Sequence, residues 1–296
     1  MTIPCYKYKD LKNNIGEAWI VSDHPEGKSK IINGAFSGKF LSEMMQTHPE
    51  WFAQFNLKEF PLLIKLLDAN NNLSVQVHPG DEYAVKTGSD ANGKTECWYI
   101  IDAEPGSEIV KGHTAKNREE FLELSGKNKW HELLVRVPAR AGDFFFIPSG
   151  AVHAVGKGIF LLEVQQNSDT TYRIYDYNRI GLNGRKRELH MEKAIEVIDF
   201  GTAYHRVEPR AIRENDLVKT ELISCDYFTV EKYAFKNVHI MQSLNVFVLI
   251  YVINGNGWLM YDDELIHLGK GISIMIPAEM GDYKIYGSIE ALLCHI

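Results

Sequence analysis

The chain has 296 residues, of which 45% are hydrophobic and 24% charged, and its formal net charge is −7 at pH 7. This composition is typical of a soluble globular protein with one large domain or two smaller ones. The negative charge argues against nucleic-acid binding, which needs a basic surface, although a local group of lysines and arginines can still bind a small anion. The longest apolar run, around residues 246–253, has the length of a strand rather than of a membrane span.

The N-terminus and the cysteines bear on where the protein works. Residues 1–7 lack the charged start and apolar stretch of a signal peptide. The four cysteines are scattered and form no CxxC pair, which favours reduced thiols over a disulfide framework. We therefore expect a cytoplasmic protein.

Three stretches of the chain have the apolar spacing of helices. Residues 39–55 place aromatic and methionine side chains at roughly helical intervals, and residues 117–134 do so with a break at Ser125-Gly126. Residues 189–200 form a third such stretch behind a charged start. The remaining apolar segments are short and separated by Gly, Pro and Asn, so we predict strands for the rest of the chain and a mainly β fold.

A weak internal repeat indicates two similar β units. Residues 142–148, Gly-Asp-Phe-Phe-Phe-Ile-Pro, recur in outline as residues 271–277, Gly-Ile-Ser-Ile-Met-Ile-Pro. Five residues after the proline, the first copy has His153 and the second has Asp282. Coincidence between two common strand patterns is the alternative explanation. We expect the boundary between the units within residues 200–222, where the chain is polar.

The segment 73–79, Leu-Ser-Val-Gln-Val-His-Pro, is the most informative part of the sequence. Its apolar residues alternate with Ser74, Gln76 and His78, so a strand would turn these three side chains to one face. On a surface they would be ordinary polar residues. Inside a barrel they would need partners, and a metal ion would be one.

Two further segments supply donors that could converge on this face. In the alternating segment 94–100, Lys94 and Glu96 share a face, and His153 follows a turn that Gly150 makes possible. Two imidazoles, a carboxylate and an amide form a mixed nitrogen and oxygen shell that can leave a place open for water or substrate. The predicted ligands are Gln76, His78, Glu96 and His153.

Each of these residues also has an ordinary explanation. A single His such as His78 is more often a hydrogen-bonded core or surface residue than a ligand, Glu96 alone would fit a solvated strand face, and His153 could cap a loop. The other eight histidines occur in no comparable context. The prediction of a metal site therefore rests on the combination.

A second polar group follows in residues 160–176. Glu163 lies between Leu162 and Val164, where burial would raise its pKa and suit proton transfer. Arg173 is either a solvent-facing cation or a planar donor for an oxyanion or phosphate.

With these residues, the chain resembles the type I mannose-6-phosphate isomerases, in particular their short bacterial form. The resemblance is carried by residues 74–79, 94–99, 148–154 and 163–173, in the same order and with similar separations. It implies a zinc-dependent enzyme of the cupin superfamily with two jelly-roll β-barrels, a small helical insertion at about 117–134 and helical connectors. It implies a catalytic metal-binding cupin domain at 1–210 and a degenerate, non-catalytic barrel at 211–296.

The resemblance also implies roles for the site residues. Gln76, His78, Glu96 and His153 would bind one Zn²⁺ per chain, with other divalent metals not excluded. Arg173 would be the essential active-site arginine, and Lys94 and Glu163 would line the pocket. Ser74 matches a position linked to the substrate phosphate, and Arg179 falls where some relatives place a phosphate-binding Lys.

The implied reaction interconverts mannose 6-phosphate and fructose 6-phosphate through an enediol(ate). Glu163 is the first candidate for the base, with Lys94 or a metal-bound hydroxide as alternatives. Two other functions stay open: a different metal-cupin enzyme, such as another sugar isomerase or an oxygenase, and a non-catalytic cupin that binds sugar phosphates. We expect a hexose 6-phosphate as the small-molecule partner, no nucleic-acid or membrane partner, and a monomer or homodimer.

Overall fold

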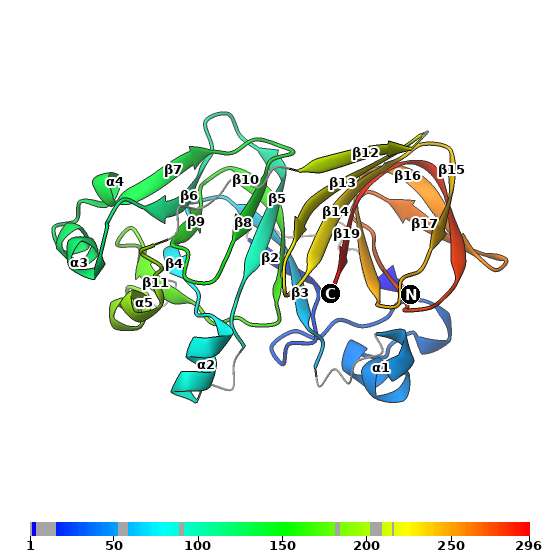
Figure 1. Cartoon of the computed structure of the whole chain (residues 1–296), viewed down its shortest axis with the longest axis horizontal. Coiled ribbons are helices and arrows are strands. Elements are labelled where there is room, and N and C mark those ends of the chain that lie inside the picture. The colour runs from blue at the N-terminus through cyan, green and yellow to red at the C-terminus, as the bar shows by residue number, and fades with distance from the viewer. Residues whose placement is uncertain are drawn as a thin grey trace. The chain divides into compact units, whose positions relative to one another are not determined.

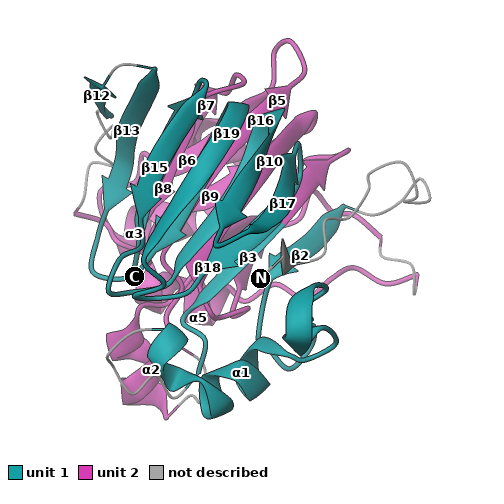
Figure 2. Cartoon of the chain, turned by 90° about the vertical axis from the view of Figure 1, so that its right-hand side faces the viewer, with its two compact units in different colours: residues 1–65, 207–296 teal, residues 66–206 magenta. Residues whose placement is uncertain are grey.

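The computed structural model describes residues 2–3, 16–52, 59–88, 92–180, 184–201, 209–214 and 216–296. They fall into two compact units, coloured separately in Figure 2: unit 1 contains residues 1–65 and 207–296, and unit 2 contains residues 66–206. Residues 1–65 thus belong to the same unit as the C-terminal part. The assignment of a catalytic domain to 1–210 and of a non-catalytic one to 211–296 stays a prediction.

The prediction of a mainly β fold is confirmed, because strands of antiparallel sheets dominate both units (Figure 1). No helix in the described parts of the chain combines the length and the apolar composition that crossing a bilayer demands. The described cysteines, Cys97, Cys225 and Cys294, form no disulfide, and Cys5 lies outside the described residues.

Unit 1 is built on a nine-stranded sheet in the order β1-β18-β16-β19-β14-β13-β12, with β15 paired to β19 and β17 to β16. The strands are β1 (Thr2–Ile3), β12 (Arg210–Glu214), β13 (Leu217–Ser224), β14 (Thr229–Phe235), β15 (Val238–Gln242), β16 (Val248–Tyr261), β17 (Glu264–Gly269), β18 (Ser273–Ile276) and β19 (Asp282–His295). Apolar side chains of β14, β16, β18 and β19 form its core. The unit also contains β2 (Glu17–Val21), the helix α1 (Leu41–Thr47) and the 3₁₀ turns Gly34–Phe36 and Pro49–Trp51.

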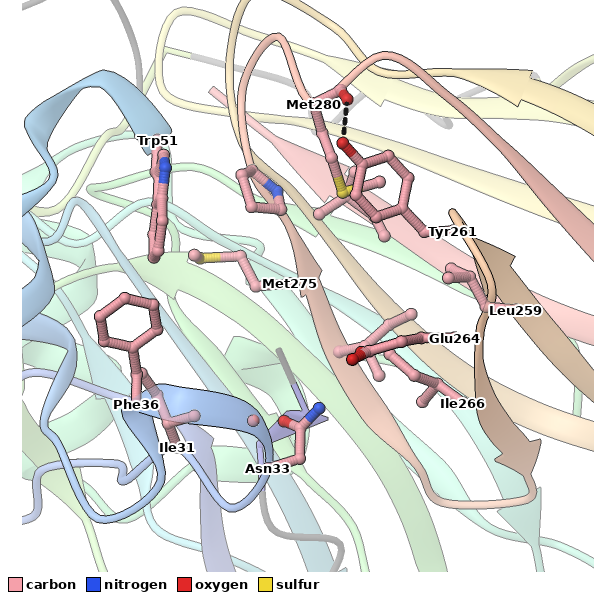
Figure 3. A pocket seen from close by; sticks show the side chains of 14 residues that line it. Ile31, Asn33, Phe36, Trp51, Leu259, Tyr261, Glu264, Ile266, Met275 and Met280 are labelled. Carbon is pink, nitrogen blue, oxygen red and sulfur yellow. Dashed lines mark hydrogen bonds between the residues drawn. The ribbon is translucent and has the colours of Figure 1, made fainter.

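A pocket in unit 1 has a volume of about 190 Å³ and mainly apolar walls (Figure 3). Phe36 and Trp51 stand on one side and Leu259 and Tyr261 on another, with the Tyr261 hydroxyl donating to the Met280 carbonyl at 2.9 Å. None of the residues predicted for the functional site lines this pocket.

Unit 2 contains two antiparallel sheets. One has the order β11-β4-β9-β6-β7, and the other includes β3, β10, β5 and β8 in that order. The strands are β3 (Leu62–Ala69), which begins in unit 1, β4 (Val75–Val77), β5 (Glu96–Ala103), β6 (Glu108–His113), β7 (Leu134–Pro138), β8 (Phe144–Ile147), β9 (His153–Val155), β10 (Ile159–Gln166) and β11 (Tyr172–Tyr175). Side chains from both sheets, among them Trp98, Ile109 and Leu161, form one apolar cluster, so the sheets pack face to face.

The outer face of the sheet β11-β4-β9-β6-β7 is covered by helices. Phe121, Leu133 and Ile195 pack with Val75 and Val77 in a second apolar cluster. The helices of this unit are α2 (Asp81–Thr87), α3 (Arg118–Gly126), α4 (Trp130–Leu133) and α5 (Met191–Val197). The two clusters determine which face of each strand points inward.

The three helical stretches predicted from the sequence are confirmed, but they are shorter than expected. The first is limited to α1 because a proline follows at position 49 and disfavours a helical residue before it; positions 53–55 lie outside the described residues. The second divides into α3 and α4 after Gly126, close to the expected break. Asn117 caps the N-terminus of α3, where its side chain accepts the Glu120 N–H at 2.9 Å. The third is α5.

The expectation that the rest of the chain forms only strands is wrong at α2. This helix begins after Gly80 and ends at Gly88, a left-handed residue with φ of 64°. Its acidic first turn, the basic Lys86 in its last turn and its terminal glycine are ordinary helix signals. Seven residues are too few to show clear periodicity, which is why the helix was missed.

Both copies of the internal repeat form the same local structure. Gly142 and Gly271 have φ of 90° and 83° and lead into β8 and β18. Beyond the turn, His153 is buried at the start of β9, whereas Asp282 is exposed at the start of β19. The two units therefore repeat the turn and the strand, but only in the first copy is the polar residue five positions after the proline buried.

Candidate functional site

A row of polar side chains crosses the inner face of the sheet β11-β4-β9-β6-β7. Arg173 pairs with Gln76, Gln76 with His153, and His153 with Lys111, each on neighbouring antiparallel strands. Residues directly opposite each other across such strands project to the same face. The side chains next to them in the chain, such as Val77 and Val110, pack against the helices on the outer face. The row therefore lies between the two sheets.

His78, Glu96 and His153 come together in the space between the two sheets. Each offers a ligand atom within 4.8 Å of the other two. His78 Nε2 lies 3.4 Å from Glu96 Oε2, and His153 Nε2 lies 3.4 Å from Glu96 Oε1. All three residues are at most 1% exposed. The structure thus brings together three residues that are 18 and 57 positions apart in the sequence.

Hydrogen bonds orient both imidazoles for metal binding. His78 Nδ1 lies 2.7 Å from the Thr170 carbonyl oxygen, and His153 Nδ1 lies 2.8 Å from that of Ala151. Carbonyl oxygens only accept, so each Nδ1 carries the proton and each Nε2 presents a lone pair to the cluster. Burial lowers the pKa of His78 to about 3 and also lowers that of His153, which keeps both rings neutral.

Gln76 completes the group of donors. Its Nε2 lies 3.4 Å from His78 Nε2 and 3.3 Å from His153 Nε2, and its Oε1 accepts a hydrogen bond from Ser74 Oγ at 3.4 Å. The amide head is therefore at the centre of the cluster, where rotation about its last bond would present the oxygen in place of the nitrogen. Ser74 is buried next to it.

The chemistry of these donors fits a divalent metal ion. Among the described residues, neither oxygen of Glu96 has a hydrogen-bond donor in good geometry, although both are fully buried. Lys94 Nζ lies 3.0 Å from Glu96 Oε2 and 3.3 Å from His78 Nε2. Burial opposes ionisation of Glu96, but the Lys94 ammonium beside it outweighs burial and holds the pKa of Glu96 well below the ordinary range. A carboxylate and two imidazole lone pairs facing one point are a typical metal-binding set.

Glu163 lies on β10, beside the cluster. It pairs with Trp98 of β5, whereas the next inward residue, Gln165, pairs with Glu96. Trp98 Nε1 donates to Glu163 Oε1 at 2.9 Å, and the Trp98 ring contacts His153 edge-on with centroids 5.5 Å apart. Glu163 is only 4% exposed, so the buried position expected from its apolar neighbours is confirmed.

Arg173 lies at the end of the row next to Gln76. Its Nη1 donates to the Glu188 carbonyl at 2.9 Å, and its backbone N–H donates to His190 Nδ1 at 3.0 Å. Among the described residues, its buried Nε has no hydrogen-bond partner. Part of the guanidinium is therefore available to a bound molecule on the inner face.

Arg179 has a different environment from the other predicted site residues. Its guanidinium pairs with the Asp176 carboxylate, which also accepts from Arg187 Nε at 2.8 Å. Arg179 Nη1 donates to the Asn72 carbonyl at 2.5 Å. Burial opposes ionisation of Asp176, but hydrogen bonds from Arg187 and Arg179 outweigh it and lower its pKa. In this arrangement Arg179 holds the loop after β11.

Asp176→Asn is expected to destabilise the protein by about 1–3 kcal/mol at pH 7, since it leaves two guanidinium groups without their carboxylate. Because the folded-state pKa of Asp176 is lowered, its contribution is present at neutral pH and is lost as the pH falls below about 4. Urea unfolding at several pH values measures this. The exposed Asp68→Asn is the control, and equal midpoints for the two variants at pH 7 would contradict the role of Asp176.

Two inward residues of this region were not predicted from the sequence. Lys111 lies opposite His153, and Gln165, which is fully buried, lies opposite Glu96. Gln165 could have been found, because it continues the alternation that includes Glu163. Lys111 follows the apolar Ile109 by two residues and therefore shares its face of the strand. A lysine near the end of a strand is usually a solvent-facing residue, however, so this pattern alone would not have indicated an inward side chain.

Comparisons with known proteins agree with this geometry. A model of the type I phosphomannose isomerase catalytic domain matches residues 1–99, and a model of the mannose-6-phosphate isomerase cupin domain matches residues 218–296. The mannose-6-phosphate isomerase ManA of Bacillus subtilis is 43% identical over 98% of this chain and 92% of its own length. The mannose-6-phosphate isomerase of Streptococcus mutans is 41% identical over 98% and 91%.

Solved structures show the same relationship. The crystal structure of the mannose 6-phosphate isomerase from Bacillus subtilis matches with a TM-score of 0.92 and 39% identity, over 95% of this chain and 90% of that one. A putative mannosephosphate isomerase from Archaeoglobus fulgidus, at 21% identity and a TM-score of 0.76 over 97% and 90% of the two chains, shares the fold. The chain therefore belongs to the type I phosphomannose isomerase family.

Proposed function

We propose that this protein is a metal-dependent aldose–ketose isomerase that interconverts mannose 6-phosphate and fructose 6-phosphate. The observation that carries the proposal is the buried cluster of His78, Glu96 and His153, with Gln76 beside it, in a chain more than 40% identical to mannose-6-phosphate isomerases over almost its full length. An amide in place of a third imidazole favours this isomerase over an oxygenase of the same fold.

The four ligands would be the Nε2 atoms of His78 and His153, the carboxylate of Glu96 and the amide oxygen of Gln76. We propose zinc, because this nitrogen and oxygen set suits it and the resemblance implies it. When bound, the metal ion supplies Lewis-acid stabilisation for the negative charge that develops on the sugar oxygens.

The reaction moves a proton between C1 and C2 of the open-chain sugar, and the surrounding residues would assist this transfer. Glu163 is our first candidate for the base, since it is a buried carboxylate held by Trp98, whose ring also contacts His153. Lys94 is the alternative, although its ammonium is paired with Glu96. Arg173 would place positive charge next to the developing oxyanion, on the side of Gln76.

Several properties of the protein are part of the same proposal. The substrate would be a hexose 6-phosphate. The resemblance implies Ser74 and Arg179 for its phosphate site; Ser74 lies next to Gln76, whereas the guanidinium of Arg179 is already paired with Asp176. We propose a cytoplasmic enzyme that acts as a monomer or homodimer. The described cysteines form no disulfide, which supports this location.

Removal of the metal is expected to abolish isomerisation, and zinc is expected to restore it. A coupled assay with mannose 6-phosphate, run before chelation, after chelation and after addition of Zn²⁺, measures both effects. Full activity in a preparation shown to be metal-free would refute the proposal. A protein that binds hexose phosphates but leaves the aldose-to-ketose ratio unchanged for hours would be a binding protein, and oxygen uptake would indicate an oxygenase.

A further inference from the structure

Lys111 lies inside unit 2, next to the candidate metal ligands. The register of β6 and β9 places Lys111 opposite His153, as the last member of the row that begins with Arg173. Its Nζ lies 5.7 Å from the ring centroid of Phe145, a residue of β8 in the facing sheet. The ammonium group therefore lies on the inner face of its sheet, close to the facing sheet.

Among the described residues, Lys111 has no carboxylate partner for the charge of its partly buried ammonium. The other cations near the site have oxygen partners: Lys94 pairs with Glu96, Arg179 with Asp176, and Arg173 donates to a backbone carbonyl. Partial burial of an ammonium without a counter-charge costs free energy, which an anionic ligand would offset.

Lys111 also lines an open pocket of unit 2. The pocket has a volume of about 450 Å³, which is within the range of small-molecule sites. Its walls include the apolar Val137 and Phe200, the second cation Lys116 and one carboxylate, Asp199. Oδ1 of Asp199 accepts the N–H of Gly201 at 2.7 Å. The lysines outnumber the carboxylate, so the pocket favours an anion.

We propose that Lys111 binds the phosphate group of the sugar substrate. This inference rests on the proposed function, in which C1 and C2 of the sugar react at the metal ligands. The phosphate is on C6, several bonds away from the reacting carbons, and Lys111 would hold it in place of Arg179, whose guanidinium is already paired with Asp176. Lys111 is one strand beyond His153, a step of about 4.8 Å. From there it faces both the interior and the open pocket.

A phosphate contact at Lys111 would position the substrate for the reaction. The charge-assisted bond between an ammonium and a phosphate is strong, and it is remote from the reacting carbons. Binding energy of this kind holds the sugar in the geometry for proton transfer. Free hexoses, which lack the phosphate, would gain nothing from it.

The test compares Lys111→Met and Lys111→Gln with Lys111→Arg and with the control Lys157→Gln. Methionine retains the apolar stem over Phe145, arginine retains the charge, and Lys157 is an exposed lysine in the turn before β10. For each variant we would measure kcat and KM with mannose 6-phosphate, the inhibition constant of inorganic phosphate, and the metal content.

Loss of the ammonium is expected to raise both KM and the inhibition constant of phosphate by about 10- to 100-fold at unchanged metal content. Lys111→Arg should recover part of both, and Lys157→Gln should behave as the unmodified protein. An unchanged inhibition constant in the folded Lys111→Met or Lys111→Gln variant, or parallel loss of metal, would overturn the proposal.

Failure of the proposed function would be recognised separately. If the unmodified metal-loaded protein does not isomerise mannose 6-phosphate, the function is wrong, and calorimetric titration with inorganic phosphate still tests Lys111. Weaker phosphate binding by Lys111→Met than by Lys157→Gln would support the anion site. Equal binding by both would reject it.

Discussion

His153→Ala is expected to eliminate stoichiometric metal binding and to reduce kcat/KM by at least about 10³-fold. His153 is one of two buried imidazoles whose Nε2 atoms face Glu96, and its Nδ1 is held by the Ala151 carbonyl. Without it, the remaining cluster has one imidazole and one carboxylate plus the amide of Gln76. Metal analysis of the purified variant, together with the coupled isomerase assay, measures both losses.

The control for this variant is His131→Ala. His131 is in α4 with 82% of its side chain exposed, so its removal should change neither metal content nor activity. His78→Ala should behave like His153→Ala, because the two imidazoles have equivalent positions relative to Glu96. Full activity of either variant in a metal-free preparation would eliminate the metal-site assignment.

Arg173→Ala is expected to lower kcat by about 10²- to 10³-fold while leaving metal content close to that of the unmodified protein. Arg173 is opposite Gln76 on the inner face, and its Nε is buried without a partner among the described residues. A guanidinium in this position would stabilise charge that develops on the sugar during proton transfer. The effect should therefore fall on kcat more than on KM.

Measurement of kcat, KM and metal content separates this role from a structural one. Arg140→Ala is the control, because Arg140 is exposed in the turn before β8. If Arg173→Ala loses metal in proportion to activity, the residue supports the site rather than the chemistry. The backbone bond from Arg173 to His190 does not depend on its side chain, so it should persist in the variant.

The site residues differ in how far their surroundings could be predicted. The alternation in 73–79 and 94–100 predicted which side chains of each strand share a face, and Gln76 and Glu96 both point from their own sheets into the space between the two sheets. Arg179 was selected only through resemblance. Its pairing with Asp176 depends on a turn of the loop after β11 that local sequence does not specify.

The helices also differ in how well local sequence predicted them. Long stretches with helical spacing, such as 117–134, indicated helices, and Pro and Gly residues decided where those helices end. The short helix α2 was missed because its end signals lack a periodic stretch between them.

The sequence by itself determined the mainly β character, the inward face of the strand that carries Gln76, and the donor types of the candidate site. These properties follow from periodicities and side-chain chemistry that act over a few residues. Only the tertiary structure decided that His78, Glu96 and His153 converge, and that Lys111 joins the row of His153 with no carboxylate partner among the described residues. Strand register depends on contacts between residues far apart in the chain, and a shift by one residue would turn Lys111 to the opposite face.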